Sequence, residues 1–143
     1  MANFEIAYNR TNMNEGGYAN VTGDNGGETY AGIARKFWGN WEGWKIIDKF
    51  KKNNGPLRRN QVINDPELNR LKKEFYKKNF WDVINGDAIE NQRTANTLYD
   101  FGVNSGQSRS IRNIQKVLGL TENGKLSKEL IDAINNPLNY FIK

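Results

Sequence analysis

The most informative stretch of this sequence is NEGGYANVTGDNGGETYAG, residues 14–32. It places Glu15 directly before two glycines, and two further acids, Asp24 and Glu28, stand on either side of a second Gly-Gly pair. Because glycine and asparagine are this frequent, we expect a loop with a short hairpin near DNGGETY rather than a longer regular element. The stretch therefore gathers three carboxylates in a flexible segment close to the N-terminus.

Glu15 follows a short helix that helical spacing predicts over residues 3–14. The negative end of a helix dipole disfavours a carboxylate, so we expect the pKa of Glu15 to be raised. A carboxylic acid that is still protonated near neutral pH is what glycoside hydrolysis needs as its general acid. Asp24 or Glu28 would then stabilise charge or activate water. Taken alone, however, EGG is more often an ordinary helix end, and DNGG more often a turn.

The composition of the 143 residues excludes several kinds of chemistry. The chain has no cysteine and no histidine, which rules out a Ser-His-Asp triad, a cysteine nucleophile and thiolate or imidazole zinc sites. The net charge of +5 suggests a polyanionic partner, which could be nucleic acid, an anionic membrane or an acidic wall polymer. The length fits one domain, and we see neither a signal peptide nor a membrane span.

The remainder of the chain has a mainly helical pattern, and the clearest helix begins at NDPELNR, where Asp65 is the expected N-cap. Other helices are predicted over residues 34–52, from about residue 87 to 103, and in the segments RSIRNIQKVLGL and LSKELIDAI. Basic segments such as KKNNGPLRR and RLKKEFYKK could bind nucleic acid. We favour a solvated helix face for them, with attraction to an anionic wall polymer as a weaker alternative.

Four tryptophans could stack on sugar rings: Trp38, Trp41, Trp44 and Trp81. The first three recur at every third residue, a spacing that also suits one buried helix face. We therefore favour core packing over sugar binding for this group, with at least one ring still able to reach a cleft.

Several motifs in order resemble the glycosyl hydrolase 108 family of bacterial and phage muramidases. EGGY at 15–18 and DNGGETYAGI at 24–33 are similar to the signature of that family. EFYKKNFWDVINGDAI and YDFGVNSG resemble its later blocks. IQKVLGLTENGKLSKELIDAI resembles the helical peptidoglycan-binding-like region that usually follows. The resemblance covers nearly the whole chain.

This resemblance implies a mainly α, lysozyme-like helical domain, with a short hairpin region near its N-terminus and C-terminal helices packed on it. It divides the chain into a muramidase domain over residues 1–103 and a peptidoglycan-binding-like region over residues 104–143 that is integral to the same fold. It also implies cleavage of the bond between N-acetylmuramic acid and N-acetylglucosamine, with Glu15 as the catalytic acid. No metal or organic cofactor is implied.

Other site residues follow from the same resemblance. The second carboxylate or water-positioning group is expected to be Asp24 or Thr29, and the residues expected to bind substrate or brace the cleft are Tyr18, Tyr30, Asp100 and Asn104. The chain departs from the family pattern at Tyr30, Ala31 and Ala34, and the resemblance assigns no role to Glu28. Asn104 could hydrogen-bond an N-acetyl group, although a helix end with a glycine C-cap also explains VNSG.

Three functions remain open on the sequence alone. The leading one is an active peptidoglycan hydrolase, such as a prophage endolysin or a secretion activator, which would act on the cell wall after export with a holin or another export partner. The second is a catalytically degenerate protein that binds peptidoglycan or assists secretion. The third is nucleic-acid binding, which rests on net charge alone, so we expect no nucleic-acid partner. We also expect no stable membrane insertion.

Overall fold

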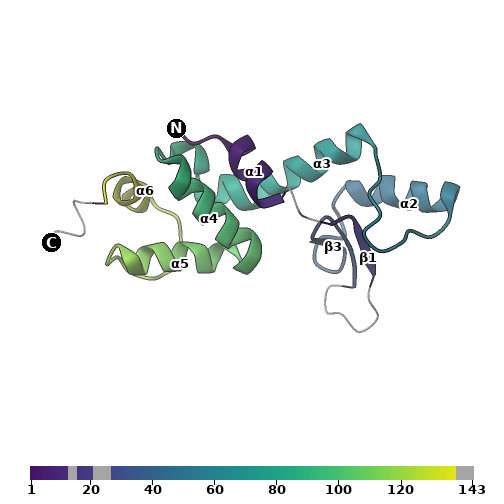
Figure 1. Cartoon of the computed structure of the whole chain (residues 1–143). Coiled ribbons are helices and arrows are strands. Elements are labelled where there is room, and N and C mark those ends of the chain that lie inside the picture. The colour runs from purple at the N-terminus through teal and green to yellow at the C-terminus, as the bar shows by residue number, and fades with distance from the viewer. Residues whose placement is uncertain (13–15, 21–26, 138–143) are drawn as a thin grey trace. The chain divides into compact units, whose positions relative to one another are not determined.

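The computed structural model describes residues 1–12, 16–20 and 27–137, and the chain divides into two compact units (Figure 1). The first unit comprises residues 1–13 and 76–143, and the second comprises residues 14–75. The architecture is mainly helical, as the sequence predicts. The helices are α1 (Phe4–Asn12), α2 (Gly43–Asn54), α3 (Pro66–Tyr76), α4 (Gln92–Ser105), α5 (Gln107–Val117) and α6 (Lys128–Asn135).

A small antiparallel sheet belongs to the second unit. Its strands are β1 (Tyr18–Asn20), β2 (Glu28–Tyr30) and β3 (Ile33–Ala34), in the order β1-β2-β3. Tyr30 lies opposite Tyr18 on one side and Ile33 on the other. The two residues between β2 and β3 both have positive φ, 50° at Ala31 and 81° at Gly32, as a type I′ hairpin turn requires. The predicted hairpin is therefore confirmed as part of a three-stranded sheet.

The second glycine of EGGY has a packing reason. The Tyr18 N–H donates to the Gln61 carbonyl at 2.9 Å, and the Asn60 N–H donates to the Tyr18 carbonyl at 2.7 Å. A Cβ on Gly17 would lie 2.0 Å from that same Gln61 oxygen. Only glycine lets the chain approach this closely, so Gly17 fixes β1 against the segment that precedes α3.

The helix expected over residues 34–52 is shorter than predicted, because α2 begins only at Gly43. The residues before it form turns. The Trp41 indole lies against Gly43, where an added Cβ would come within 2.3 Å of the ring. Gly43 is the first residue of α2, and its lack of a side chain leaves room for the Trp41 ring.

The tryptophans of the second unit form an aromatic cluster rather than one helix face. Trp44 is buried, and its indole N–H donates to the Trp38 carbonyl at 3.0 Å. Trp38 and Trp41 are half-buried and meet Phe75 edge-on, with ring centroids 4.9 and 6.1 Å away. Core packing is confirmed for Trp44, while Trp38 and Trp41 precede the helix on which they were expected.

In the first unit, α4 packs against both α1 and α5. Phe4 of α1 contacts Trp81 and Tyr99, with centroid distances of 5.7 and 5.8 Å. Between α4 and α5, the buried Ser110 hydroxyl donates to the Leu98 carbonyl at 2.9 Å. These contacts make α4 the central helix of this unit. Trp81 itself is fully buried, which confirms core packing for the fourth tryptophan.

Caps set the helix boundaries, and one predicted boundary is wrong. Asp65 accepts from the Leu68 N–H at 2.9 Å, which confirms the predicted cap of α3. Helix α4 begins at Gln92 rather than near Asp87, because the Asn91 side chain accepts from the Thr94 N–H at 3.0 Å. Asp87 instead accepts from the Trp81 indole N–H at 2.9 Å. A π-helical turn (Lys77–Trp81) and two 3₁₀ turns (Asp82–Ile84 and Gly86–Ala88) lead from α3 toward α4.

The C-terminal helices are integrated into the first unit, as predicted. Ser127 caps α6 by accepting from the Leu130 N–H at 3.0 Å. At the other end of α6, Asn135 donates to the Ala88 carbonyl and accepts from the Glu90 N–H, both at 2.9 Å. The division at residues 103/104 stays a prediction. In the described part of the chain, none of the helices has the length and apolar character that a membrane span requires.

Candidate active site

The sheet of the second unit has two different faces, because side chains alternate along each strand. Tyr18 and Tyr30 lie directly opposite each other and are both buried, so their face is the inner one. Thr29 points to the other face, where its neighbours across the sheet are Ala19 and Ala34. All three of these small residues are only half-buried. The face that carries Thr29 can therefore admit a ligand more easily than the inner face can.

Glu28 is the centre of an ion-pair network at the edge of the inner face. Its Oε2 accepts from the Tyr18 hydroxyl and from the Lys51 ammonium, both at 2.6 Å. Its Oε1 accepts from the Arg35 guanidinium at 3.0 Å. Arg35 also forms a two-pronged pair with Asp48, at 2.8 and 2.7 Å. This network joins β2 to α2, which carries Asp48 and Lys51.

The network keeps Glu28 ionised. Burial raises the pKa of the Glu28 carboxyl, but hydrogen bonds from its three donors outweigh burial and bring the pKa below its ordinary value of 4.5. The guanidinium of Arg35 likewise lowers the pKa of Asp48. Burial lowers the pKa of the Lys51 ammonium, but its hydrogen bond to Glu28 reverses this, and the pKa is raised overall. Glu28 therefore stabilises the structure as an ionised carboxylate. A general acid, by contrast, has to hold a proton.

Tyr18 and Tyr30 hold the sheet in place. Burial, followed by the hydrogen bond to Glu28, raises the pKa of the Tyr18 hydroxyl. The Tyr30 side chain is only 2% exposed, and its hydroxyl accepts from the Ile63 N–H at 3.1 Å. Both hydroxyls are directed to protein partners, so the geometry favours a bracing role for these two residues over direct contact with substrate.

Asp100 and Asn104 belong to the first unit, where they stand one turn apart on α4. The Asp100 carboxylate accepts from the Thr11 hydroxyl of α1 at 3.1 Å, and the Asn104 amide donates to the Asp100 carbonyl at 2.8 Å. Both side chains are exposed. Gly106 ends the helix with a φ of 94°, as the VNSG motif predicts. The two polar side chains are accessible to a ligand, and their role in binding stays a prediction.

Glu15 and Asp24, the two carboxylates on which the sequence analysis depends most, lie outside the described residues. Thr29 is described, and its half-buried position on the open face of the sheet is compatible with holding water.

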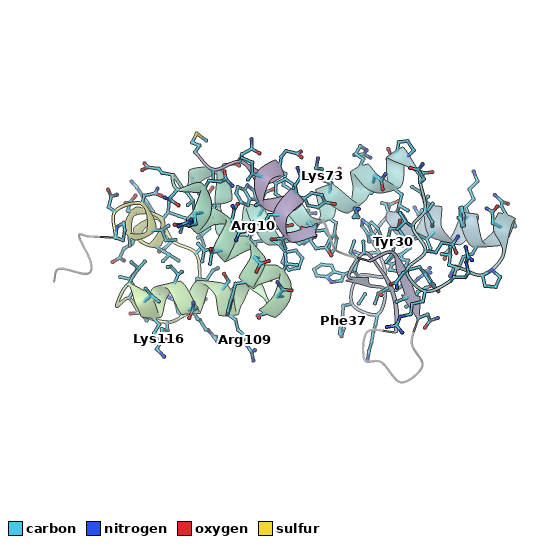
Figure 2. The ribbon with its side chains drawn as sticks, viewed as in Figure 1. Arg10, Tyr30, Phe37, Lys73, Arg109 and Lys116 are labelled. Atoms are coloured by element: carbon cyan, nitrogen blue, oxygen red, sulfur yellow. The ribbon has the colours of Figure 1, made fainter. Side chains whose placement is uncertain are left out.

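The sequence analysis did not identify Phe37, an exposed aromatic residue, as a candidate for sugar contact. Phe37 follows β3 and is 66% exposed, and it lies at the periphery of its unit in Figure 2. Its N–H donates to the Ala34 carbonyl at 3.2 Å, and the Lys36 ammonium lies 5.7 Å from its ring centroid. Aromatic rings match the apolar faces of pyranoses, so Phe37 is better placed than the buried Trp44 to contact a sugar. Its chain position, four residues after the motif that ends at Ile33, is the signal that could have identified it.

Comparison with known proteins assigns this arrangement to a family. The family model described as Glycosyl hydrolase 108 matches residues 8–106, a range that contains the whole sheet and α4. The solved structure of Brucella abortus SagA is similar, with a TM-score of 0.66 and 26% sequence identity over 93% of this chain and 68% of that chain. No curated protein matches the chain. These similarities confirm the lysozyme-like fold and indicate a glycoside hydrolase that acts on a polysaccharide of the peptidoglycan type. The chain belongs to the glycosyl hydrolase 108 family.

Proposed function

We propose that this protein is an N-acetylmuramidase that cleaves the β-1,4 bond between N-acetylmuramic acid and N-acetylglucosamine in peptidoglycan. The observation that supports this most directly is the family match over residues 8–106, which includes the EGGY motif with Glu15. In this proposal, Glu15 donates its proton to the glycosidic oxygen while the sugar develops oxocarbenium character. The bond to the leaving sugar then breaks, and water completes the hydrolysis.

The residues around the sheet have separate roles in this mechanism. The ionised Glu28 and its partners hold β2 against α2, and Tyr18 and Tyr30 fix β1 and β2 in register. Asp24 or Thr29 stabilises charge or positions water. Thr29 can do so as a neutral group, because hydroxyls both donate and accept hydrogen bonds. The proposal requires no metal or organic cofactor.

The departures from the family pattern have a structural explanation that favours an active enzyme. Tyr30 and Ala31 are each 2% exposed. Differences from the family pattern at these two positions therefore alter the packing of the core and not a surface that contacts substrate. Ala34 is half-buried on the open face, where a small side chain leaves room for a ligand. These positions therefore give little support to the alternative of a degenerate protein that binds peptidoglycan or assists secretion.

The proposed activity also requires that the protein reach peptidoglycan in the cell. Peptidoglycan lies outside the cytoplasm, so action on the wall requires passage of the protein across the membrane. We include in the proposal that a holin or another export partner provides this passage. Whether the protein serves as a phage endolysin or in bacterial secretion depends on that partner.

The test is product analysis with Glu15→Gln, a change that preserves shape and removes the acidic proton. Purified peptidoglycan is incubated with wild type, with Glu15→Gln and with Glu42→Gln, whose exposed carboxylate pairs with Lys45 on the surface. Wild type and Glu42→Gln should release fragments with new muramic-acid reducing ends, visible by mass spectrometry after borohydride reduction. Loss of the general acid should slow release at least about a hundredfold. A smaller loss would contradict the role of Glu15, and binding without release by wild type would identify the degenerate alternative.

A further inference from the structure

One buried side chain has a polar atom without a hydrogen-bond partner. Asn12, the last residue of α1, is 7% exposed. Its Oδ1 accepts from the Tyr99 hydroxyl at 2.7 Å. Its Nδ2 has no partner, and no other buried side-chain nitrogen or oxygen of the described residues shares this deficit. Because an unpaired buried donor lowers the free energy of unfolding, the presence of an amide here has to be explained by something other than stability.

The Tyr99 side chain fixes the position of the Asn12 amide. Tyr99 is fully buried on α4, and its ring meets Phe4 and Trp81 edge-on, with centroid distances of 5.8 and 6.1 Å. With the ring held by these two neighbours, the hydroxyl is directed at Asn12. Turning the amide over would only transfer the deficit from its nitrogen to its oxygen, since one of the two atoms has to face Tyr99.

This bond is one of two that connect the end of α1 to α4, the helix against which α1 packs (Figure 1). The residue before Asn12, Thr11, donates from its hydroxyl to the Asp100 carboxylate at 3.1 Å. Two consecutive residues of α1 therefore bond to two consecutive residues of α4. Helix ends fray when nothing holds them, and these two bonds hold the last turn of α1.

The chain that leaves this turn leads to the proposed general acid. Only residues 13 and 14 separate Asn12 from Glu15, and three residues of chain span at most about 10 Å. The orientation of the last turn of α1 therefore limits where the Glu15 carboxyl can lie. General-acid catalysis depends on this placement, because the acid must come within hydrogen-bond reach of the glycosidic oxygen.

We propose that Asn12 and Tyr99 are positioning residues, which fix the end of α1 and, through it, the Glu15 carboxyl. This inference rests on the proposed function, because it names further residues for the same cleavage. A neutral amide and hydroxyl suit this task, since they anchor the chain without bringing a cation to the acid. Glu28 shows the contrast, because two cations pair with it and a carboxylate held in that way stays ionised. The unpaired Nδ2 is then a loss of stability that accompanies the placement of Glu15.

The experiment replaces the polar pair by apolar side chains of similar shape, in Asn12→Leu/Tyr99→Phe. Such a double replacement is close to neutral for stability, so the thermal unfolding midpoint of this variant should equal or exceed that of wild type. The control is Ser110→Ala, which removes another buried hydroxyl that donates to α4, at the Leu98 carbonyl. Tyr99→Phe alone is measured too, so that the test stands even if the double variant does not fold. Cleavage of soluble glycan strands is followed by the release of muramic-acid reducing ends, which gives kcat, KM and their pH dependence.

The double variant should lose about tenfold in kcat, because the acid is misplaced, while KM stays unchanged because neither residue contacts substrate. The alkaline limb of its kcat profile should move toward lower pH, since a loosened helix end raises the pKa of Glu15 less. Tyr99→Phe should change in the same directions, whereas Ser110→Ala should keep both kcat and the alkaline limb. An unchanged kcat in the Tyr99 variants, an equal loss in Ser110→Ala, or a rise in KM alone would overturn the inference.

The two proposals can fail separately. If wild type releases no muramic-acid reducing ends, or if Glu15→Gln still cleaves, the proposed function is refuted before any comparison of the positioning variants. If wild type cleaves and depends on Glu15, but the variants of Asn12 and Tyr99 keep its kcat and pH profile, only the positioning role is refuted.

Discussion

Replacing Glu28 by glutamine is expected to destabilise the second unit by about 2 kcal/mol, the value of roughly one charge-assisted hydrogen bond. Glu28 is 15% exposed and accepts from two cations and one hydroxyl. Glutamine keeps the shape but removes the charge, and it offers one acceptor oxygen where three donors converge. The loss is limited because Arg35 keeps both bonds to Asp48. It is further limited because the cations are about a third exposed and partly screened.

The control for this prediction is Glu67→Gln. Glu67 also pairs with an arginine, Arg70, but both side chains are more than half exposed. Exposed pairs of this kind contribute little to stability, because solvent and salt screen the two charges. The comparison of Glu28 with Glu67 therefore isolates the effect of burial and of the network from the effect of losing one surface charge.

The assay is urea unfolding followed by tryptophan fluorescence, which reports mainly on the second unit because Trp38, Trp41 and Trp44 all lie there. A shift in the midpoint without a change in slope gives the difference in the free energy of unfolding. If Glu28→Gln costs no more than Glu67→Gln, the network does not hold β2 to α2. The reasoning that makes Glu28 a structural anion would then be refuted.

Two further predictions concern pH and sugar contact. Because the pKa values of Glu28 and Asp48 are lowered in the folded state, both carboxylates stabilise it at any pH above their ordinary pKa values of 4.5 and 3.8, and this stabilisation is lost as the pH falls further. The difference in unfolding free energy between wild type and Glu28→Gln should therefore be full at neutral pH and shrink below pH 4.5. A difference that stays constant down to strongly acidic pH would contradict this prediction. Phe37→Leu should raise KM about fivefold with kcat unchanged, since an aromatic stacking contact contributes about 1 kcal/mol. Phe37→Tyr should retain wild-type KM, and Val62→Ala, which changes another exposed apolar side chain of the same unit, should have no effect; an unchanged KM for Phe37→Leu would exclude the contact.

Local signals in the sequence predicted the elements that local interactions form. Asp65 and Pro66 specified the start of α3, because a cap and a rigid first turn need only neighbouring residues. The hairpin was predicted for the same reason. The start of α4 was misplaced because Asp87 is used by Trp81, a tertiary contact that competes with capping. Similarly, the start of α2 at Gly43 depends on where the Trp41 ring lies.

The candidate site was only partly predictable for a related reason. The motif identified Tyr18 and Thr29, but it could not show that Tyr18 donates to Glu28. Arg35 and Lys51 stand 7 and 23 residues from Glu28 in sequence, so no local pattern connects them. Periodicity favoured core packing for the tryptophans, but it did not indicate that Phe37 would be the most exposed aromatic side chain among the described residues. The exposed fraction of a side chain depends on packing across the whole unit, so the spacing of residues in the sequence does not predict it.

The positions of the other carboxylates narrow the choice of general acid within the second unit. A general acid must retain a proton near neutral pH, and a cation at hydrogen-bond distance works against this by stabilising the ionised form. Among the described residues of 14–75, a neighbouring cation lowers the pKa of Glu28, Asp48 and Glu67, which works against a general-acid role for these three. Glu15 and Asp24 lie outside the described residues. The resemblance to the family motif makes Glu15 the proposed general acid of the two. Glu15→Gln and Asp24→Asn, compared on the same peptidoglycan, form the most direct test of this choice. Glu15→Gln should abolish cleavage, whereas Asp24→Asn should do so only if Asp24 rather than Thr29 is the second catalytic group, and cleavage retained by Glu15→Gln but lost in Asp24→Asn would refute the choice.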